Sequence, residues 1–203
     1  MRIISILRST IPMILNGNNS NFAVIEAIEA IKEAFSLEAI FTRRSIRRFT
    51  NEPVTQEQIT GLLQAAMTAP SAGNQQPWEF IVVRERAPLV EITTFHQYSE
   101  MLKEASAAII VCADVKRSKY PFDYWIQDCS AATQNILLAA VSAGLGTCWL
   151  GIYPQSERVE GVRRIFGIPE SVVPFAIVAV GYPARVPRRP SRFDETRIHQ
   201  EKW

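Results

Sequence analysis

The clearest pattern of hydrophobic and polar positions lies between two prolines, Pro53 and Pro70. Hydrophobic residues recur there at helical spacing and form one stripe: Ile59, Leu62, Leu63, Ala66 and Met67. Thr55 and Gln58 have the spacing of a capping box. Val54 stands where a hydrophobic staple requires it, five positions before the first residue of the stripe. The pattern predicts an amphipathic helix that begins near Thr55 and ends before the second proline.

Four short hydrophobic runs with β-branched residues are typical of buried strands. These runs are Trp78–Val83, Ala107–Cys112, Thr147–Leu150 and Val172–Val180. Pro174 lacks a backbone donor, so we expect it at the start of the fourth strand or at a sheet edge.

Three further segments have helical spacing: Pro88–Glu104, Tyr124–Ala143 and Ser156–Phe166. Gly144 and Gly167 follow the last two, where glycine commonly ends a helix, and Ser156 is a candidate cap for the third. The tail after Gly181 carries several prolines among arginines, so it is not expected to begin as regular secondary structure.

The N-terminal segment differs from the rest of the chain. A polar break is followed by hydrophobic residues at helical spacing, Val24, Ile28, Ile31 and Phe35. A short helix over Leu37–Phe41 then leads to Arg43. Since no internal repeat or second linker is present, we expect an N-terminal extension with one helix over residues 1–36 and a single domain over residues 37–203.

The composition fits one folded domain. Of 203 residues 47% are hydrophobic and 21% are charged, so the chain can bury a core, and disorder is not expected. A formal net charge of +2 is too small to indicate a nucleic-acid partner. Arginines nevertheless cluster at Arg43–Arg48 and at Arg185–Arg192. Two such local clusters suggest a discrete anion as the ligand.

Cysteine usage and hydropathy indicate the compartment. The three cysteines are odd in number and widely spaced, which is typical of buried free thiols in a reducing compartment: Cys112, Cys129 and Cys148. His96 and His199 lie in unrelated segments, so we expect no metal site. Pro12 interrupts the hydrophobic N-terminus, no small-x-small cleavage site follows it, and no hydrophobic run reaches about 18 residues. We expect a soluble, cytoplasmic protein with no membrane partner.

Two segments carry the candidate chemistry. Arg43, Arg44 and Arg47 place three guanidinium groups within five positions, beside the Ser45 hydroxyl, and guanidinium suits phosphate. Pro70–Trp78 sets small, polar and turn-forming residues between two hydrophobic segments, as in a loop over a ligand. Each has a plainer alternative, a solvated basic turn for the first and a simple helix-to-strand connection for the second.

Known catalytic motifs are missing. No strand leads into a glycine-rich helix start, so neither a Rossmann fingerprint nor a P-loop is present. Ser71 and Cys148 have no histidine at a suggestive position, so no nucleophile and base pair is evident. A site without catalytic side chains indicates a cofactor that carries the chemistry.

Four motifs, taken in order, resemble the FMN-dependent nitroreductase family. They are Arg43-Arg44-Ser45-Ile46-Arg47-Arg48-Phe49, Pro70-Ser71-Ala72-Gly73-Asn74-Gln75-Gln76-Pro77-Trp78-Glu79-Phe80-Ile81-Val82, Gly144-Leu145-Gly146-Thr147-Cys148-Trp149-Leu150-Gly151 and Gly181-Tyr182-Pro183. The resemblance runs from about Leu37 to Trp203, which is more specific than any single motif. It implies an α+β fold with a mixed central sheet flanked by helices, working as an intertwined homodimer with FMN at the subunit interface.

The resemblance also implies the cofactor-binding residues. Arg43 and Arg44 would hold the FMN phosphate, Ser45 the ribityl chain and Arg47 the pyrimidine edge, where a cation stabilises reduced flavin. From the loop, Pro70, Ser71 and Asn74 would contribute, the last two from the other subunit. Leu150 and Gly151 would lie beside the isoalloxazine, with a backbone amide near N5, and Arg189 or Arg192 would supply a further phosphate contact. The flavin N5 atom carries the chemistry, so no side chain is expected to be catalytic.

The implied function is an oxidoreductase that moves hydride from NADH or NADPH through FMN to an electron-poor small molecule, such as a nitroaromatic or a quinone, in two half-reactions. Trp149, Tyr153 or Phe122 are candidates for the acceptor pocket, although core packing is the simpler role for each. The alternatives within this fold are a flavin-dependent dehalogenase or a flavin-fragmenting enzyme. A non-catalytic flavin-binding protein and a nucleic-acid binder that uses the arginine clusters are the alternatives of other classes.

Overall fold

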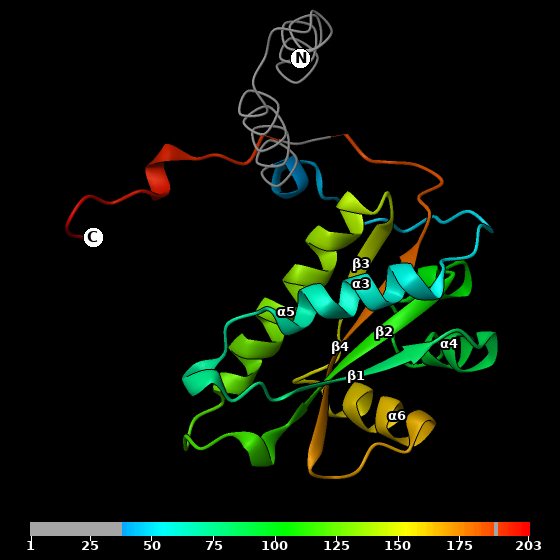
Figure 1. Ribbon diagram of the computed structural model, residues 1–203, viewed down its shortest axis with the longest axis horizontal. Coiled ribbons are helices and arrows are strands. Elements are labelled where there is room, and N and C mark those ends of the chain that lie inside the picture. Colours follow the sequence, from blue (N-terminus) through cyan, green and yellow to red (C-terminus); the bar gives the residue numbers. More distant parts are fainter. Residues whose placement is uncertain (1–37, 189–190) are drawn as a thin grey trace, which may run out of the picture.

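The computed structural model describes residues 38–188 and 191–203 (Figure 1). The helix expected between Val24 and Phe35 lies outside these residues, and so does Arg189. Residues 38–42 are helical, as expected for the segment that leads to Arg43, and the Arg43 amide donates to the Ala39 carbonyl at 3.0 Å.

Four strands form one sheet in the order β1-β2-β4-β3. Their bounds are β1 Trp78–Val83, β2 Ala107–Asp114, β3 Gly146–Gly151 and β4 Val172–Gly181. All three strand pairs are antiparallel. Within the described residues, the parallel pairing that a mixed sheet requires is confined to an isolated bridge between Ser45 and Thr147. Pro174 lies near the start of β4 beside a register irregularity opposite Cys112, which accommodates its missing donor.

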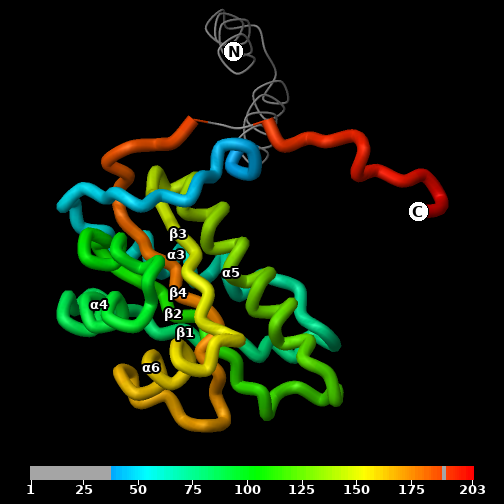
Figure 2. The backbone as a smooth tube through the Cα atoms, turned by 180° about the vertical axis from the view of Figure 1, so that it is seen from behind, coloured from blue at the N-terminus to red at the C-terminus, as the bar shows by residue number. Residues whose placement is uncertain are grey.

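Four α-helices cover the two faces of the sheet (Figures 1 and 2). They are α3 Gln56–Met67, α4 Arg86–Ile92, α5 Tyr124–Ser142 and α6 Ser156–Phe166. Four short 3₁₀ turns complete the described elements: η1 Ala72–Asn74, η2 Glu100–Lys103, η3 Val115–Arg117 and η4 Glu195–Arg197. No helix in the described part of the chain is long and hydrophobic enough to cross a bilayer.

Strand alternation explains how the sheet holds two hydrophobic cores. Ile109 of β2 and Val178 of β4 point to the face covered by α3 and α5, where they join Ile59 and Ile136 in one cluster. Ile110, one position further along β2, belongs to a second cluster on the face covered by α4 and α6. A sheet buried on both faces needs continuous hydrophobic strands, as the four runs in the sequence predicted. The expected α+β architecture is confirmed.

Local helix signals determine where the helices begin and end. At the start of α3, the Gln58 amide donates to Thr55 Oγ1 at 3.2 Å, and the Thr55 amide donates to Gln58 Oε1 at 2.9 Å. This is the predicted capping box. Gly167 ends α6 in the left-handed conformation with φ of 62°, as predicted, but the N-cap of α6 is Gln155 rather than Ser156.

One predicted helix is wrong in extent. Pro88–Glu104 is not a single helix, because α4 ends at Ile92 and only η2 follows. Between them the chain turns inward and buries His96 and Ser99, which are 2% and 0% exposed. The Ser99 amide and hydroxyl both donate to the His96 carbonyl, which stabilises the turn in place of helical hydrogen bonds.

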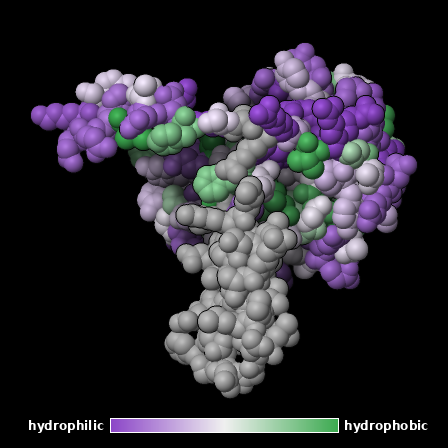
Figure 3. Space-filling model, turned by 90° about the horizontal axis from the view of Figure 1, so that it is seen from above, coloured by the Kyte–Doolittle hydropathy of each residue, from purple (hydrophilic) through white to green (hydrophobic). Residues whose placement is uncertain are grey.

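The C-terminal residues 191–203 form an arm that projects from the body (Figures 1 and 2). Its hydrophobic side chains are exposed, with Phe193 at 80% and Trp203 at 102% of their reference areas. In Figure 3 hydrophobic patches alternate with hydrophilic ones along this arm. Only η4 is regular within it, in keeping with the irregular tail that the prolines predicted.

Candidate functional site

The Arg43–Arg47 segment lies along the outer edge of β3. The Ile46 amide donates to the Thr147 carbonyl at 2.8 Å, and Ser45 forms its bridge to the same residue. This approach requires glycine at position 146, because a Cβ there would lie 2.7 Å from Ile46 Cγ1. The contact fixes the direction in which the neighbouring arginines leave the backbone.

Three arginines converge on one groove of about 490 Å³. Arg43 and Arg44 come from the edge segment, and Arg192 comes from the C-terminal arm about 150 residues later. Burial lowers the pKa of Arg43, and the charges of Arg192 and then Arg44 lower it further. The three guanidinium groups line the same groove, as predicted for a shared anion.

The charge in this groove is not neutralised by the chain itself. Among the residues that the structure describes, Arg43, Arg44 and Arg192 take part in no ion pair with a carboxylate. The Arg44 Nη1 atom donates to the carbonyls of Phe41 and Arg43, whereas its Nε atom is buried without a hydrogen-bond partner. A buried donor without a partner costs about 1–3 kcal/mol, so this site fits an anion that supplies the missing acceptor.

A second groove, of about 420 Å³, lies at the end of β3 and includes Arg47, Leu150 and Gly151. Since the Thr147 carbonyl points outward to Ile46, strand alternation turns the backbone N–H of Gly151 to the same open edge. A Cβ at Gly151 would meet no atom of the chain within 4 Å. Here the glycine leaves space for a ligand rather than for protein, and it presents a backbone donor to that space.

Two side chains hold the Gly151 carbonyl. His96 Nε2 and Arg158 Nη1 each lie 3.0 Å from its oxygen. Burial lowers the pKa of His96, and the Arg158 charge lowers it further, so the ring is neutral at pH 7. The His96 Nδ1 atom accepts from the Tyr98 amide at 3.3 Å, which assigns the ring proton to Nε2. The carbonyl of the residue beside the open groove therefore has contacts from two other segments, one distant in the sequence and one in the next helix.

No pattern in the sequence indicated this arrangement. His96 and Arg158 are 55 and 7 residues from Gly151 along the chain, and neither belongs to a recognisable motif. Of the acceptor-pocket candidates, Trp149 lines the second groove and also packs, like Tyr153, partly buried against the hydrophobic core, whereas Phe122 is 63% exposed.

The Ser71–Gln76 loop connects α3 to β1 through the η1 turn and has an uncommon backbone conformation. Gly73, Asn74 and Gln76 all have positive φ, of 58°, 56° and 49°. The Ser71 hydroxyl accepts from the Gln76 amide at 3.0 Å. On the helix side, the buried Asp128 of α5 accepts from the Ala72 amide at 2.9 Å. These contacts set the positions of the Ser71 hydroxyl and the Asn74 amide.

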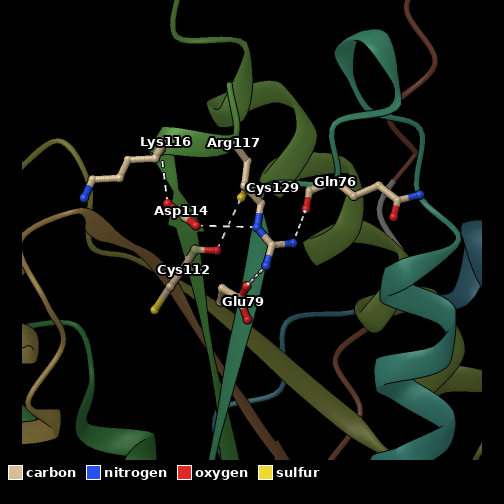
Figure 4. Close-up of polar contacts among 7 residues, drawn as sticks. All are labelled: Gln76, Glu79, Cys112, Asp114, Lys116, Arg117 and Cys129. Carbon is tan, nitrogen blue, oxygen red and sulfur yellow. Dashed lines mark hydrogen bonds and ion pairs between the residues drawn. The ribbon is translucent and has the colours of Figure 1, made fainter. Parts of the chain in front are cut away.

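Arg117 contacts both the sheet and the C-terminal end of the loop (Figure 4). It pairs with Glu79 of β1 at 2.8 Å and with Asp114 of β2 at 3.5 Å, and its Nη1 atom lies 3.5 Å from the Gln76 carbonyl. These contacts connect the end of the loop to β1 and β2.

The loop and the arginine groove lie at opposite ends of α5. Asp128, which holds the loop, is in the second turn of the helix, whereas Val141 at its other end lines a cavity of about 200 Å³ with Arg44 and Thr42. Asp128 and Val141 are 13 residues apart in this helix, a separation of about 20 Å. Within one chain the structure therefore brings Arg43, Arg44 and Arg192 together but leaves Pro70, Ser71 and Asn74 apart from them. Arg189 lies outside the described residues.

The three cysteines are buried free thiols in the described part of the chain. Burial raises the pKa of Cys112 and of Cys129 to about 12, and it raises that of Cys148 as well, although Arg47 and Arg43 oppose this shift. Cys129 Sγ donates to the Cys112 carbonyl at 3.7 Å (Figure 4). No group of three or more potential metal ligands occurs among the described residues.

Comparison with known proteins identifies relatives of the whole domain. The model described as "Nitroreductase family" matches residues 40–94 and 87–182. A protein of Archaeoglobus fulgidus named "Putative NADH dehydrogenase/NAD(P)H nitroreductase" is 52% identical over 170 residues, which cover 82% of this chain and 98% of that protein.

Solved structures agree with the sequence matches. A Bacteroides thetaiotaomicron protein with the same name has a TM-score of 0.79 at 43% identity, covering 83% of this chain and 98% of the other. A Desulfovibrio desulfuricans structure described as "a putative nitroreductase in complex with fmn" has a TM-score of 0.72 at 31% identity, covering 83% and 97%.

Proposed function

The chain belongs to the Nitroreductase family, and from this premise we propose that it is an FMN-dependent oxidoreductase that uses NADH or NADPH to reduce an electron-poor acceptor. Nitroaromatics and quinones are the proposed acceptors. Relatives support the cofactors by name: one from Bacillus subtilis is called "FMN reductase [NAD(P)H]", and the Desulfovibrio structure contains FMN. When bound, FMN would accept a hydride from the nicotinamide and pass two electrons to the acceptor in a separate half-reaction.

The observation that carries this proposal is the convergence of Arg43, Arg44 and Arg192 without a carboxylate partner among the described residues. The buried Nε of Arg44 supports it, because a phosphate oxygen is an acceptor of the right charge. These three arginines would hold the FMN phosphate, with Arg189 as a further candidate.

The second groove would hold the ring system. Arg47 would lie at the pyrimidine edge, where its charge stabilises the anionic reduced form, and Ser45 would contact the ribityl chain between the two grooves. The outward N–H of Gly151 would donate to the flavin near N5, while Leu150 lies beside the ring. Because the edge segment runs along β3 from the first groove toward the second, both ends of one ligand can be held by one stretch of chain.

Pro70, Ser71 and Asn74 would complete this site from a second copy of the chain. Their separation along α5 from the arginine groove supports a contribution from the partner subunit rather than from the same protomer. An intertwined homodimer, with the exposed hydrophobic arm of residues 191–203 packed on the partner, accounts for both features.

The proposal is tested by the absorption spectrum of the purified protein, before and after anaerobic addition of NADH or NADPH. A flavin spectrum that bleaches with either donor and recovers on addition of a nitroaromatic supports it. A protein that neither contains nor binds FMN would reject it, and a yellow protein that no donor reduces would indicate a non-catalytic flavin binder.

A further inference from the structure

Arg158 lies in the wall of the second groove, and its charge has no part in the proposed flavin contacts. It is the third residue of α6. Its Nη1 atom donates to the Gly151 carbonyl, and its guanidinium carbon lies 5.9 Å from the centroid of the Tyr98 ring. The carbonyl and the ring hold the guanidinium group in one orientation at the edge of the groove.

The groove carries excess positive charge. Its one carboxylate in the described part of the chain, Glu100, is paired with Lys103 at 2.8 Å, and His96 is a buried ring. Within the described residues, Arg47 and Arg158 take part in no ion pair. Arg47 is already proposed to face the flavin. Arg158 therefore remains as a cation available to a second ligand.

We propose that Arg158 binds a carboxylate on the electron acceptor, so that the protein prefers carboxylated acceptors to neutral ones of the same shape. This inference rests on the proposed function. Since Arg158 contacts the residue whose N–H would face flavin N5, an acceptor placed for electron transfer beside Gly151 lies within reach of the guanidinium group.

The geometry of the side chain suits this role. A guanidinium group has five N–H donors in a planar fork, and the hydrogen bond to Gly151 uses one of them. The remaining donors can bind a carboxylate in the bidentate manner that arginine favours. The phosphates of a nicotinamide donor have the same charge, so the test must separate donor from acceptor.

The test compares two acceptors, 4-nitrobenzoate and neutral 4-nitrobenzamide, with the FMN-loaded protein and its variants. We expect kcat/KM to favour 4-nitrobenzoate by about tenfold or more, which is the value of one charge-assisted hydrogen bond. Arg158→Gln keeps a donor for the Gly151 carbonyl but loses the charge, and it should abolish this preference. Arg158→Lys, which keeps the charge without the fork, should retain part of it.

Arg164→Gln is the matched control. Arg164 is an exposed arginine of the same helix, paired with Glu91 at 3.2 Å, so its loss changes the net charge equally without touching the groove. This variant should keep the wild-type ratio. A wild-type protein with no preference, or an Arg158→Gln variant that keeps the ratio, would overturn the proposal.

Separate measurement of the two half-reactions, reduction of the flavin by the donor and its oxidation by the acceptor, distinguishes the remaining outcomes. Stopped-flow absorption measures the reduction of the flavin by each donor. If Arg158→Gln slows reduction by NADPH but not by NADH, the bound anion belongs to the donor and the inference about the acceptor is wrong. Failure of this inference alone leaves both acceptors reduced, in a ratio that Arg158→Gln does not change. Failure of the proposed function leaves neither acceptor reduced and the flavin unreactive toward both donors, which refutes the inference with it.

Discussion

Substitution of Gly146 by alanine tests whether the arginine segment depends on its close approach to β3. A Cβ at this position would lie 2.7 Å from Ile46 Cγ1, 2.9 Å from its Cβ and 3.0 Å from its Cγ2. Carbon atoms in contact prefer about 3.5–4.0 Å, so residue 46 must move by roughly 0.5–1 Å. Its Cβ is attached to the backbone, so the segment itself has to shift. Overpacking of this kind costs about 1–3 kcal/mol of stability.

The same shift should weaken FMN binding, because the side chains of Arg43, Arg44 and Arg47 are attached to the displaced backbone and move with it. We expect Gly146→Ala to lower the free energy of unfolding in urea by about 2 kcal/mol and to raise the Kd for FMN by about tenfold. Quenching of FMN fluorescence measures the Kd for FMN on the folded protein, so a loss of affinity is not confused with unfolding.

Two further variants test whether the effect of Gly146→Ala comes from its contact with Ile46. Ile46→Ala removes two of the three close atoms, so in that background Gly146→Ala should cost about 1 kcal/mol less. Gly61 in α3 is exposed, and a methyl group added there would meet no atom within 4 Å, so Gly61→Ala should stabilise the protein by about 0.5–1 kcal/mol. If Gly146→Ala is as stable as wild type and binds FMN equally, the reasoning about the close approach is refuted.

Single contacts elsewhere in the fold lead to three other predictions. The pKa of His96 is lower in the folded protein than in the unfolded chain, so below about pH 6.5 the unfolded chain binds more protons. The free energy of unfolding should therefore fall as the pH drops from 6.5 through the folded pKa. Urea titrations should show that this free energy depends less on pH in His96→Gln. Asp128→Ala should cost about 2 kcal/mol, because the Ala72 amide loses its acceptor, whereas Asp128→Asn should cost less; equal costs would contradict this role for the Asp128 side chain. Cys112 and Cys129, with pKa values of about 12, should resist alkylation at pH 8 in the native protein and react after denaturation, as mass spectrometry can measure.

Features of the fold that depend on neighbouring residues could be predicted from the sequence. The capping box of Thr55 and Gln58 and the strand Trp78–Val83 are determined by side chains a few positions apart, and both occur where expected. The order of strands in the sheet depends on contacts between distant segments, so it was not evident from the pattern. The segment after Ile92 leaves the helix because His96 reaches a carbonyl on β3, and no local signal indicates such a contact.

The candidate site also contains some features that could be predicted from the sequence and others that could not. Resemblance to a family grouped Arg43 and Arg44 with Arg189 or Arg192. The structure brings Arg43, Arg44 and Arg192 to one groove, and Arg189 lies outside the described residues. The contacts of His96 and Arg158 with Gly151 could not be predicted, since these residue types are common and their meeting depends on the packing of η2 and α6 against the sheet.

Arginines from distant parts of the chain are proposed to bind the phosphate of one flavin. Riboflavin lacks only that phosphate, so the most direct measurement is the Kd of FMN and of riboflavin for the wild-type protein and for the variant Arg43→Gln, Arg192→Gln. We predict that wild type binds FMN at least about a hundredfold more tightly and that the variant loses most of this difference. Equal affinity of the wild-type protein for the two flavins would contradict the account.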